Sequence, residues 1–559
     1  MKGLGKLFSF GIDLVYVAVF LLSLLILGVS LLTTVVFRQN EQNDLFDFTA
    51  ENIPLLLLSM VVVFLLMLFV QAAAKNHGKK QNMGLLSFRG GRRQGKKEEN
   101  GEASLKTDHP AFPWVMMIFG GAISLFLVLV IRGNPTADAS QLDEIINQFM
   151  EGDYSALEPG EYLDVYPFQI PYVYIGELIA HVVGQSNYLV WQLISVIAVE
   201  VILYSLYQIT WELFENKTIC RIEQILSCGM FVLFVFSTFI YLDVWSIAVQ
   251  TLAVYWQILY MKRDKIRYEV LAGIGISFAC LMKGNSLIAL IAMVIMLVVD
   301  AVWKWVKHRR GVLKAVLLCV MLGLMTSALS SAVDAYTLHR TGIDEIPTGL
   351  PTEAYLAMGM QTAEGKCGWY NGVTRSLYTE SGYDTEKTKE LALIEIDNAI
   401  AEFDNSGRYF VNFYFQKFIS QWGDSTCVSM KEMENTERHV EHVSELANSL
   451  IFGTGNKILS WVMNVEHSMI YLGMVIYCAA VLWGKRKDKE RGRRFSSEEA
   501  MIVIFIFGGM LFHEIWEASG RYIMRYYFAM LPLASWGWSF LVEFVLEKGK
   551  EAQKRHLAK

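Results

Sequence analysis

Long apolar blocks separated by short polar segments make up most of this 559-residue chain. Each block is long enough to cross the hydrocarbon core of a bilayer, which takes roughly 17–25 residues as a helix. A helix is expected in each block because an unpaired backbone amide in lipid costs several kcal/mol. The pattern predicts twelve membrane-spanning helices, at residues 9–37, 53–73, 111–132, 186–213, 222–240, 243–261, 268–282, 285–303, 312–337, 457–484, 499–518 and 522–546.

Two polar regions interrupt this pattern. In the first, residues 133–167, apolar residues recur at the spacing of one helix face, which predicts a short helix lying on the membrane surface. Those residues are Leu142, Ile145, Ile146 and Phe149. The second region, residues 339–456, lies between the ninth and tenth predicted spans. It contains amphipathic stretches at 389–403 and 408–421, which predict a small folded domain of mixed structure.

The composition excludes a soluble multidomain protein. Hydrophobic residues make up 53% of the chain and charged residues 19%, whereas soluble proteins carry about 25% charged residues. Seven cysteines in this length are also too sparse for a disulfide-stapled secreted domain. Cys367 and Cys427, the two cysteines of the 339–456 insert, could pair on an oxidising side of the membrane.

The distribution of basic residues predicts which side each loop faces. One set of alternate loops, which includes both termini, holds 34 of the 49 Lys and Arg residues. The positive-inside rule places this set in the cytoplasm. Residues 133–167, with eight carboxylates and no basic residue, and residues 339–456 are then outside the cell membrane. The predicted fold is an all-α polytopic membrane protein with one small extracytoplasmic domain.

The predicted spans and loops divide the chain into five parts. Residues 1–74 hold two N-terminal spans, and residues 75–110 form a basic cytoplasmic linker that lies near membrane lipids. Residues 111–338 form the core, 339–456 the extracytoplasmic domain, and 457–559 the last spans and a basic tail. No Walker loop, GxGxxG or metal-ligand spacing is found, and the basic runs adjoin the membrane. We therefore expect no nucleic-acid partner and no metal site.

Polar residues gather at the predicted outer face in three places. Asp138 lies at the start of the surface helix, where it could cap the helix or act in catalysis. Lys283 occupies a very short turn between the seventh and eighth spans, where a lipid phosphate would lie. The third place is the turn between the last two spans, with His513 and Glu517 on one helix face and Arg521 just after them. Nucleotide donors are absent from that side, so a polyprenyl-phosphate sugar fits this chemistry.

At these residues the chain resembles the membrane glycosyltransferases of the GT-C class, in the bacterial branch related to protein O-mannosyltransferases and aminoarabinose transferases. The similarity covers roughly residues 111–546 and rests on motifs in their order along the chain. The turn at 281–285 differs from the family's Lys-Pro-Asn because Gly284 replaces the proline. The motifs are Ala137-Asp138, Phe149, Gly152-Asp153-Tyr154, Tyr162-Leu163, Tyr166-Pro167-Phe168-Gln169, Leu281-Met282-Lys283-Gly284-Asn285 and Glu517-Ala518-Ser519-Gly520-Arg521-Tyr522.

The resemblance implies a catalytic mechanism without a bound nucleotide or cofactor, although a weak dependence on a divalent cation is possible. A polyprenyl-phosphate sugar would be the donor, and a glycan, lipid or protein would be the acceptor. The family's general base corresponds to Asp138, with Asp143 and Glu144 as the rival placement, and Lys283 and Arg521 would hold the phosphate. The remaining substrate-binding candidates are Tyr166, Gln169, His513, Glu517 and Tyr522.

Two other functions stay open at this point. A transporter or lipid flippase also has many spans with both termini inside, and Glu200 in the middle of the fourth span favours it. However, the two halves show no repeat, and the polar residues gather near one face. A polysaccharide polymerase or ligase would use lipid-linked substrates as well, but it would need more arginine than the insert offers before Arg408.

Overall fold

The computed structural model describes residues 2–38, 45–88, 114–308, 311–363, 365–437, 443–484 and 494–557, and they are almost entirely helical. Among these residues, nine helical segments are long and apolar enough to cross a membrane. The expected all-α polytopic membrane fold is confirmed. The nine segments are built on α1 (Lys2–Ser30), α2 (Ile53–Phe88), α3 (Trp114–Ile131), α7 (Tyr188–Phe214), α10 (Asp243–Arg263), α12 (Leu287–His308), α13 (Val312–Thr341), α20 (Thr454–Leu482) and α22 (Gly520–Leu557).

The other three predicted spans, residues 222–240, 268–282 and 499–518, are not among these nine segments. Residues 222–240 do not make one helix, because α8 (Lys217–Ser227) ends before α9 (Phe231–Phe236) begins. At the break, the carboxylate of Glu466 occupies the position that a side chain at Gly229 would need. The expected seventh and eleventh spans are the helices α11 (Ile266–Met282) and α21 (Ser497–Ile515), of which α21 carries Glu498, Glu499 and Glu514.

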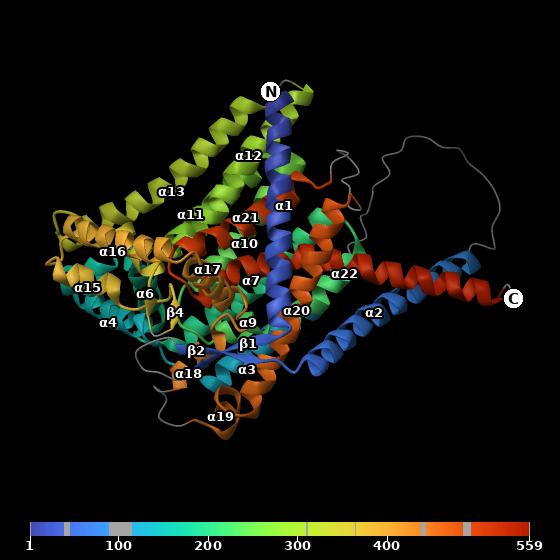
Figure 1. The fold of residues 1–559 in the computed structure, drawn as a ribbon, viewed down its shortest axis with the longest axis horizontal. Coiled ribbons are helices and arrows are strands. Elements are labelled where there is room, and N and C mark those ends of the chain that lie inside the picture. The colour runs from blue at the N-terminus through green and yellow to red at the C-terminus, as the bar shows by residue number, and fades with distance from the viewer. Residues whose placement is uncertain are drawn as a thin grey trace.

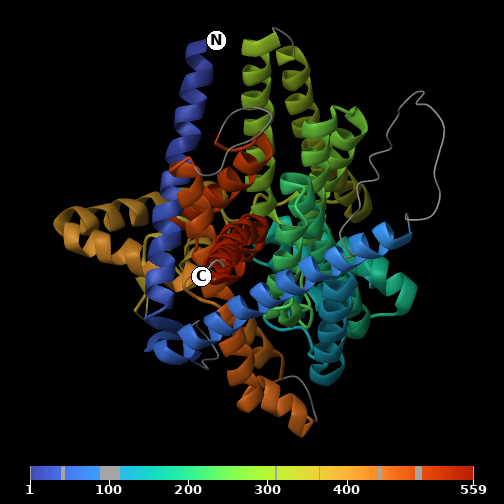
Figure 2. The same ribbon diagram turned by 90° about the vertical axis from the view of Figure 1, so that its right-hand side faces the viewer.

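The first helix is also shorter than the apolar block that encodes it. It ends at Ser30, and the β-branched residues that follow form β1 (Thr33–Arg38), paired antiparallel with β2 (Leu45–Ala50). Valine and threonine pack well on a pleated surface, which explains the switch. Figure 2 shows α1 along one side of the helix bundle, where it packs against α20, α21 and α12.

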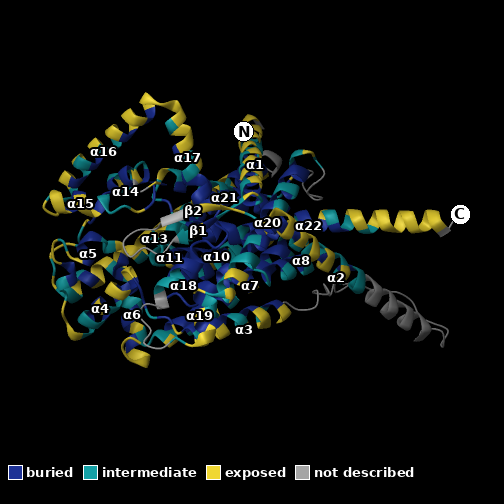
Figure 3. Ribbon diagram, turned by 60° about the horizontal axis from the view of Figure 1, so that its bottom comes forward, coloured by how far each residue is buried: buried dark blue, intermediate teal, exposed yellow. Residues whose placement is uncertain are grey.

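The buried core lies where the central helices meet. Helix α10 packs against α7 and α11, and α20 packs against α22. Figure 3 shows buried residues gathered over α7, α10, α20 and α21, whereas the C-terminal part of α22 is exposed.

The 133–167 region folds into short helices next to the 339–456 insert. The predicted surface helix is α4 (Asp138–Glu151), and its four apolar residues are buried. It is followed by η1 (Ser155–Leu157), α5 (Tyr162–Val165), η2 (Pro167–Gln169) and α6 (Ile170–Val183). Arg340 of α13 forms a two-pronged ion pair with Glu177 of α6, at 2.5 and 2.6 Å, and donates to the carbonyl of Phe149.

The 339–456 insert is a set of short helices with two strands of two residues each. The expected amphipathic stretches lie within α16 (Thr385–Asn405) and α17 (Gly407–Trp422). Cys367 and Cys427 are both buried and free. In Figure 1, α15 and α16 lie on the same side of the molecule as α4 and α6. The other elements are α14 (Thr352–Gly359), β3 (Thr362–Ala363), β4 (Lys366–Cys367), α15 (Val373–Glu380), α18 (Ser429–Glu437) and α19 (Glu445–Ile451).

Candidate active site

A cavity of about 1060 Å³ lies among the ends of α4, α11 and α22 and the 339–456 insert. It is at the upper end of the range of roughly 300–1,000 Å³ that is usual for small-molecule sites, so two substrates can meet in it. Residues far apart in the sequence converge on its wall. Of the residues predicted from the sequence, Asp138, Tyr166, Gln169, Lys283, Glu517, Arg521 and Tyr522 line the cavity.

Asp138 is exposed to the cavity at the first turn of α4. The N-cap position of this helix belongs to Ala137, which has a positive φ of 47°. Asp138 is therefore not the cap of α4, and its carboxylate is available for another role. Tyr162 lies beside this carboxylate, and burial together with the negative charge of Asp138 raises the pKa of Tyr162. Tyr162 thus stays a hydrogen-bond donor.

Two cations that line the cavity share one buried carboxylate behind its wall. Lys283 Nζ lies 3.3 Å from Asp243 Oδ1, and Arg521 Nε lies 3.7 Å from Asp243 Oδ2. Arg521 Nη1 lies 3.6 Å from Glu432 of α18. These are long separations for ion pairs, and Arg521 Nε is buried without a hydrogen bond among the described residues. The cluster can therefore turn its donors toward an anion that enters the cavity.

Glu517 lies in the turn of residues 516–519, which joins α21 to α22. Burial and the negative charge of Asp138 raise the pKa of Glu517 to about 7, although Arg521 and Lys283 act in the opposite direction. Glu517 can therefore gain or lose a proton near neutral pH. Arg521, Lys283 and Tyr522 are the neighbours that favour its charged form.

Aromatic side chains cover much of the remaining wall. Lys283 Nζ lies 4.7 Å from the ring centre of Tyr241, and the Arg521 guanidinium lies 5.4 Å from the same ring. Gln169 donates a hydrogen bond to the hydroxyl of Tyr241. Across the cavity, Tyr355 of the insert stacks on Trp516 at 5.1 Å between ring centres. The apolar faces of such rings can pack against a sugar, and the ring of Tyr241 also attracts the Lys283 and Arg521 cations.

The rival carboxylates lie outside the cavity wall. Asp143 accepts hydrogen bonds from the hydroxyls of Ser186 at 2.9 Å and Tyr188 at 2.7 Å. These contacts connect α4 to the start of α7. Glu144 is exposed on α4 and does not line the cavity. This placement separates Asp138 from the other two acids in a way that the sequence could not.

His513, which the sequence placed among the candidates, and His467 both lie behind the cavity wall. His513 is buried and stacks on the ring of Tyr522, with 5.8 Å between ring centres. His467 is buried and contacts the carbonyl of Trp422 at 3.0 Å. Both residues support aromatic packing under the cavity and do not line it. Glu200 packs against Gly121 of α3 instead of lining the cavity, so it offers no support for a transport pathway there.

Three residues of the cluster were missed by the sequence reading: Asp243, Tyr241 and Glu432. Asp243 is the first residue of α10, where an acid is expected simply because it suits a helix N-terminus. Tyr241 belongs to an aromatic-rich segment and Glu432 to a polar helix, and neither segment has a distinctive spacing of residues. A buried acid flanked by apolar residues at the start of a span was the available signal.

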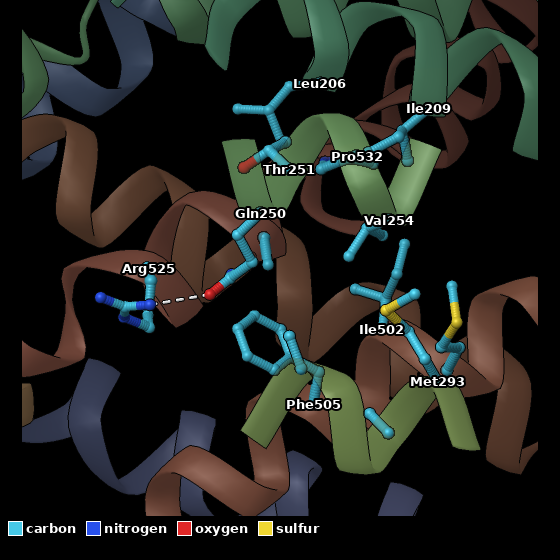
Figure 4. Close-up of a pocket in the computed structure, with 14 residues that line it drawn as sticks. Leu206, Ile209, Gln250, Thr251, Val254, Met293, Ile502, Phe505, Arg525 and Pro532 are labelled. Atoms are coloured by element: carbon cyan, nitrogen blue, oxygen red, sulfur yellow. Dashed lines mark hydrogen bonds between the residues drawn. The ribbon is translucent and has the colours of Figure 1, made fainter. Parts of the chain in front are cut away.

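A second cavity lies deeper among α7, α10, α12, α21 and α22, and Figure 4 shows it. Its volume of about 30 Å³ admits a water molecule at most. Arg525 borders it and donates to Gln250 at 2.8 Å and to Ser286 at 2.8 Å. This cavity is too small for a sugar, whereas the larger one has room for it. Within the described residues, His, Cys, Asp and Glu form no group of three or more that could hold a metal ion.

The chain is similar to a known protein family and to solved structures. Residues 170–326 match the family dolichyl-phosphate-mannose-protein mannosyltransferase. Among solved structures, the chain is similar to the apo oligosaccharyltransferase of Archaeoglobus fulgidus, with 16% identity and a TM-score of 0.39, over 80% of this chain and 52% of that chain. It is also similar to apo ArnT from Cupriavidus metallidurans, with 12% identity and a TM-score of 0.32, over 76% of this chain and 77% of that chain. The search of curated proteins found no match.

The chain spans about half the length of the oligosaccharyltransferase that it matches. The family match begins with α6 and extends into α13, and so includes Asp243 and Lys283 of the cation cluster. The resemblance seen in the motifs is thereby confirmed at the level of the class. Over residues 170–326 the chain is therefore similar to the dolichyl-phosphate-mannose-protein mannosyltransferases, and its fold is that of a polytopic helical membrane protein.

Proposed function

We propose that this protein transfers a sugar from a polyprenyl-phosphate donor to an acceptor hydroxyl on the extracytoplasmic side of the cell membrane. Lys283 and Arg521 hold the donor phosphate, and Asp138 is the general base. One observation carries the proposal: a single cavity of about 1060 Å³ is lined by this carboxylate and by both cations, although they come from three separate parts of the chain.

The chemistry is one displacement at C1 of the sugar. The acceptor oxygen forms a bond to C1 while the bond from C1 to the phosphate oxygen breaks, and the acceptor proton passes to Asp138. Attack from the face opposite the phosphate inverts the configuration at C1. Lys283 and Arg521 stabilise the charge that develops on the leaving phosphate, which is the main need of such a step. Tyr166, Gln169, Glu517 and Tyr522 line the space in which the sugar would sit.

Release of polyprenyl phosphate tests this proposal. The purified protein is incubated with a panel of polyprenyl-phosphate sugars and with membranes of the source organism, which supply the acceptor. We expect one donor to release polyprenyl phosphate in step with the appearance of sugar on the acceptor. Movement of the intact donor across a vesicle membrane, without release, would instead support the transporter.

The predicted sidedness can be tested on intact cells. A cysteine or epitope tag placed within 339–456 should react with a reagent that cannot cross the membrane, and a tag within 75–107 should not. The reason is the excess of basic residues in the loops on the side of residues 75–107. Part of that stretch lies outside the described residues. Reversed labelling would place the cavity in the cytoplasm and contradict the proposed donor.

The pH dependence of donor binding should report Glu517. The donor is a phosphate diester and stays anionic, whereas the pKa of Glu517 is raised to about 7 by burial. Below pH 7 the neutral carboxyl does not repel the phosphate, and above it the carboxylate does. Donor affinity should therefore fall as pH rises through about 7. The bound phosphate raises the pKa of Glu517 further, and the total fall in affinity is about tenfold for each pH unit of that rise.

The matched variant for this measurement is Glu517→Gln, which mimics the neutral acid. Its donor affinity at pH 8 should equal that of the wild-type protein at pH 6, as measured by titration of the purified protein with donor. If Glu517→Gln keeps the wild-type pH dependence, another group is responsible for it.

A further inference from the structure

The turn that carries Glu517 follows the C-terminal end of α21. The last carbonyls of a helix have no partner within the helix, and a buried helix end needs other donors to satisfy them. Here the partners come from the 339–456 insert, on α17. The turn is therefore held by a domain that lies about a hundred residues earlier in the sequence.

Lys417 of α17 is fully buried at this end of α21. Its ammonium donates to the carbonyls of Gly359 at 2.6 Å, Glu514 at 2.9 Å and Trp516 at 2.7 Å. All three N–H bonds of the ammonium are thereby used. A cation at a helix C-terminus is also favoured by the helix dipole.

Gln421, one turn further along α17, contacts the same segment. Its Nε2 donates to the carbonyl of His513 at 3.4 Å, and its Oε1 accepts the N–H of Ser519 at 3.3 Å. The N–H of Ala518 donates to the carbonyl of Gly368 in the insert at 2.8 Å. Donors and acceptors of the insert thus contact both sides of Glu517.

We propose that Lys417 is a positioning residue, whose ammonium fixes the Glu517 turn and so couples the 339–456 insert to the cavity. This inference rests on the proposed role of the cavity in sugar transfer. Lys417 does not line the cavity, so its contribution passes through the backbone of residues 514–516. The charge is part of the role, because a neutral amine has two N–H bonds and cannot serve three carbonyls.

The surroundings of Lys417 lower the pH at which its ammonium loses a proton. Burial lowers the pKa of Lys417, and the facing groups Glu514, Cys367 and Glu517 act in the opposite direction. The side chain packs directly against Gly368, since a Cβ on Gly368 would lie 2.6 Å from Lys417 Cε. Turnover should therefore decline on the alkaline side at a pH below the usual range of a lysine.

The test replaces Lys417 by Met, which keeps the length of the side chain and removes the charge. We expect kcat/KM for the donor to fall by about tenfold to a hundredfold, because the turn places Glu517 and leads into Arg521, which binds the donor phosphate. The alkaline decline should disappear in Lys417→Met. Lys387→Met is the matched control, since Lys387 lies on the exposed face of α16 and should show neither change.

Hydrogen exchange provides a measurement that does not depend on the reaction. The amides of residues 516–519 should exchange faster in Lys417→Met than in the wild-type protein, even if no donor has been found. Unchanged exchange together with a kcat/KM within twofold of the wild-type value would overturn the inference. If Lys417→Met does not fold, Gln421→Met tests the same contact from the next turn of α17 and should accelerate exchange at Ser519. Faster exchange without any sugar transfer by the wild-type protein would contradict the proposed function and keep the structural role.

Discussion

Asp138→Asn is expected to lower the turnover of sugar transfer by about 10²–10⁴-fold, which is the usual contribution of a general base. The amide is nearly the same size as the carboxylate but cannot accept the acceptor's proton. Its carbonyl can still accept a hydrogen bond from Tyr162, whose raised pKa keeps the hydroxyl protonated. Because Ala137 holds the N-cap of α4, the exchange removes no cap, and the variant should fold normally. Turnover is measured as release of polyprenyl phosphate at saturating donor.

Asp143→Asn is the matched control, on the same helix but outside the cavity. Asp143 accepts two hydrogen bonds that connect α4 to the start of α7. Its replacement should lower the free energy of unfolding by about 1 kcal/mol and leave turnover per folded molecule near normal. If instead Asp143→Asn abolishes transfer and Asp138→Asn does not, the base is on Asp143. If both variants keep turnover, the carboxylate mechanism is wrong.

The helical fold could be predicted from hydropathy because the environment leaves few alternatives. In lipid, the backbone must satisfy its own hydrogen bonds, so an apolar block of sufficient length becomes a helix. The periodicity of α4 was equally informative, since Leu142, Ile145, Ile146 and Phe149 are buried as expected. Local pattern and tertiary packing agree at these residues.

The break between α8 and α9 could not be predicted, because it depends on a contact between distant residues. Glu466 of α20 approaches Gly229 so closely that no larger residue fits there. In the sequence, residues 222–240 show only an apolar block with a glycine inside it. The end of α1 was missed for a related reason, since the partner of β1 comes from β2, beyond an intervening segment.

The candidate site could also be predicted only in part. Asp138, Lys283 and Arg521 could be proposed from the sequence because charged groups at the predicted membrane face are costly and few. Asp243 could not be linked to them, because 40 residues separate it from Lys283 and only the packing of α10 against α11 brings the two side chains together. Lys417 has no local signal at all, since its partners are backbone carbonyls of other segments.

The sharing of Asp243 has a consequence for the charge of the cavity. Lys283, Arg521 and Arg525 all act on the fully buried carboxylate of Asp243, and Glu432 lies 3.6 Å from Arg521. These three cations and two carboxylates leave one positive charge in excess. A phosphate diester carries one negative charge and would complete the balance. Removal of either cation should therefore weaken donor binding more than it changes turnover at saturating donor.

Arg521→Ala and Lys283→Ala are each expected to weaken donor binding by about 10- to 100-fold, since a hydrogen bond to a charged group contributes about 1.5–3 kcal/mol. Arg521→Lys should recover only part of this loss, because the planar fork that can hold two phosphate oxygens is gone. Binding is measured by titration with the donor. Lys314→Ala is the control, since Lys314 forms an exposed pair with Asp264 and does not line the cavity.

The Lys283→Ala variant leaves the carboxylate of Asp243 with one cation fewer in a buried site, and a buried charge without its partner is strongly destabilising. The combined variant Asp243→Asn with Lys283→Met removes both members of the pair and keeps the local charge balance. It should fold and still bind the donor weakly, because the ammonium that reaches the phosphate is absent. Donor affinity equal to that of the wild-type protein in this variant and in Arg521→Ala would mean that the phosphate binds elsewhere in the cavity.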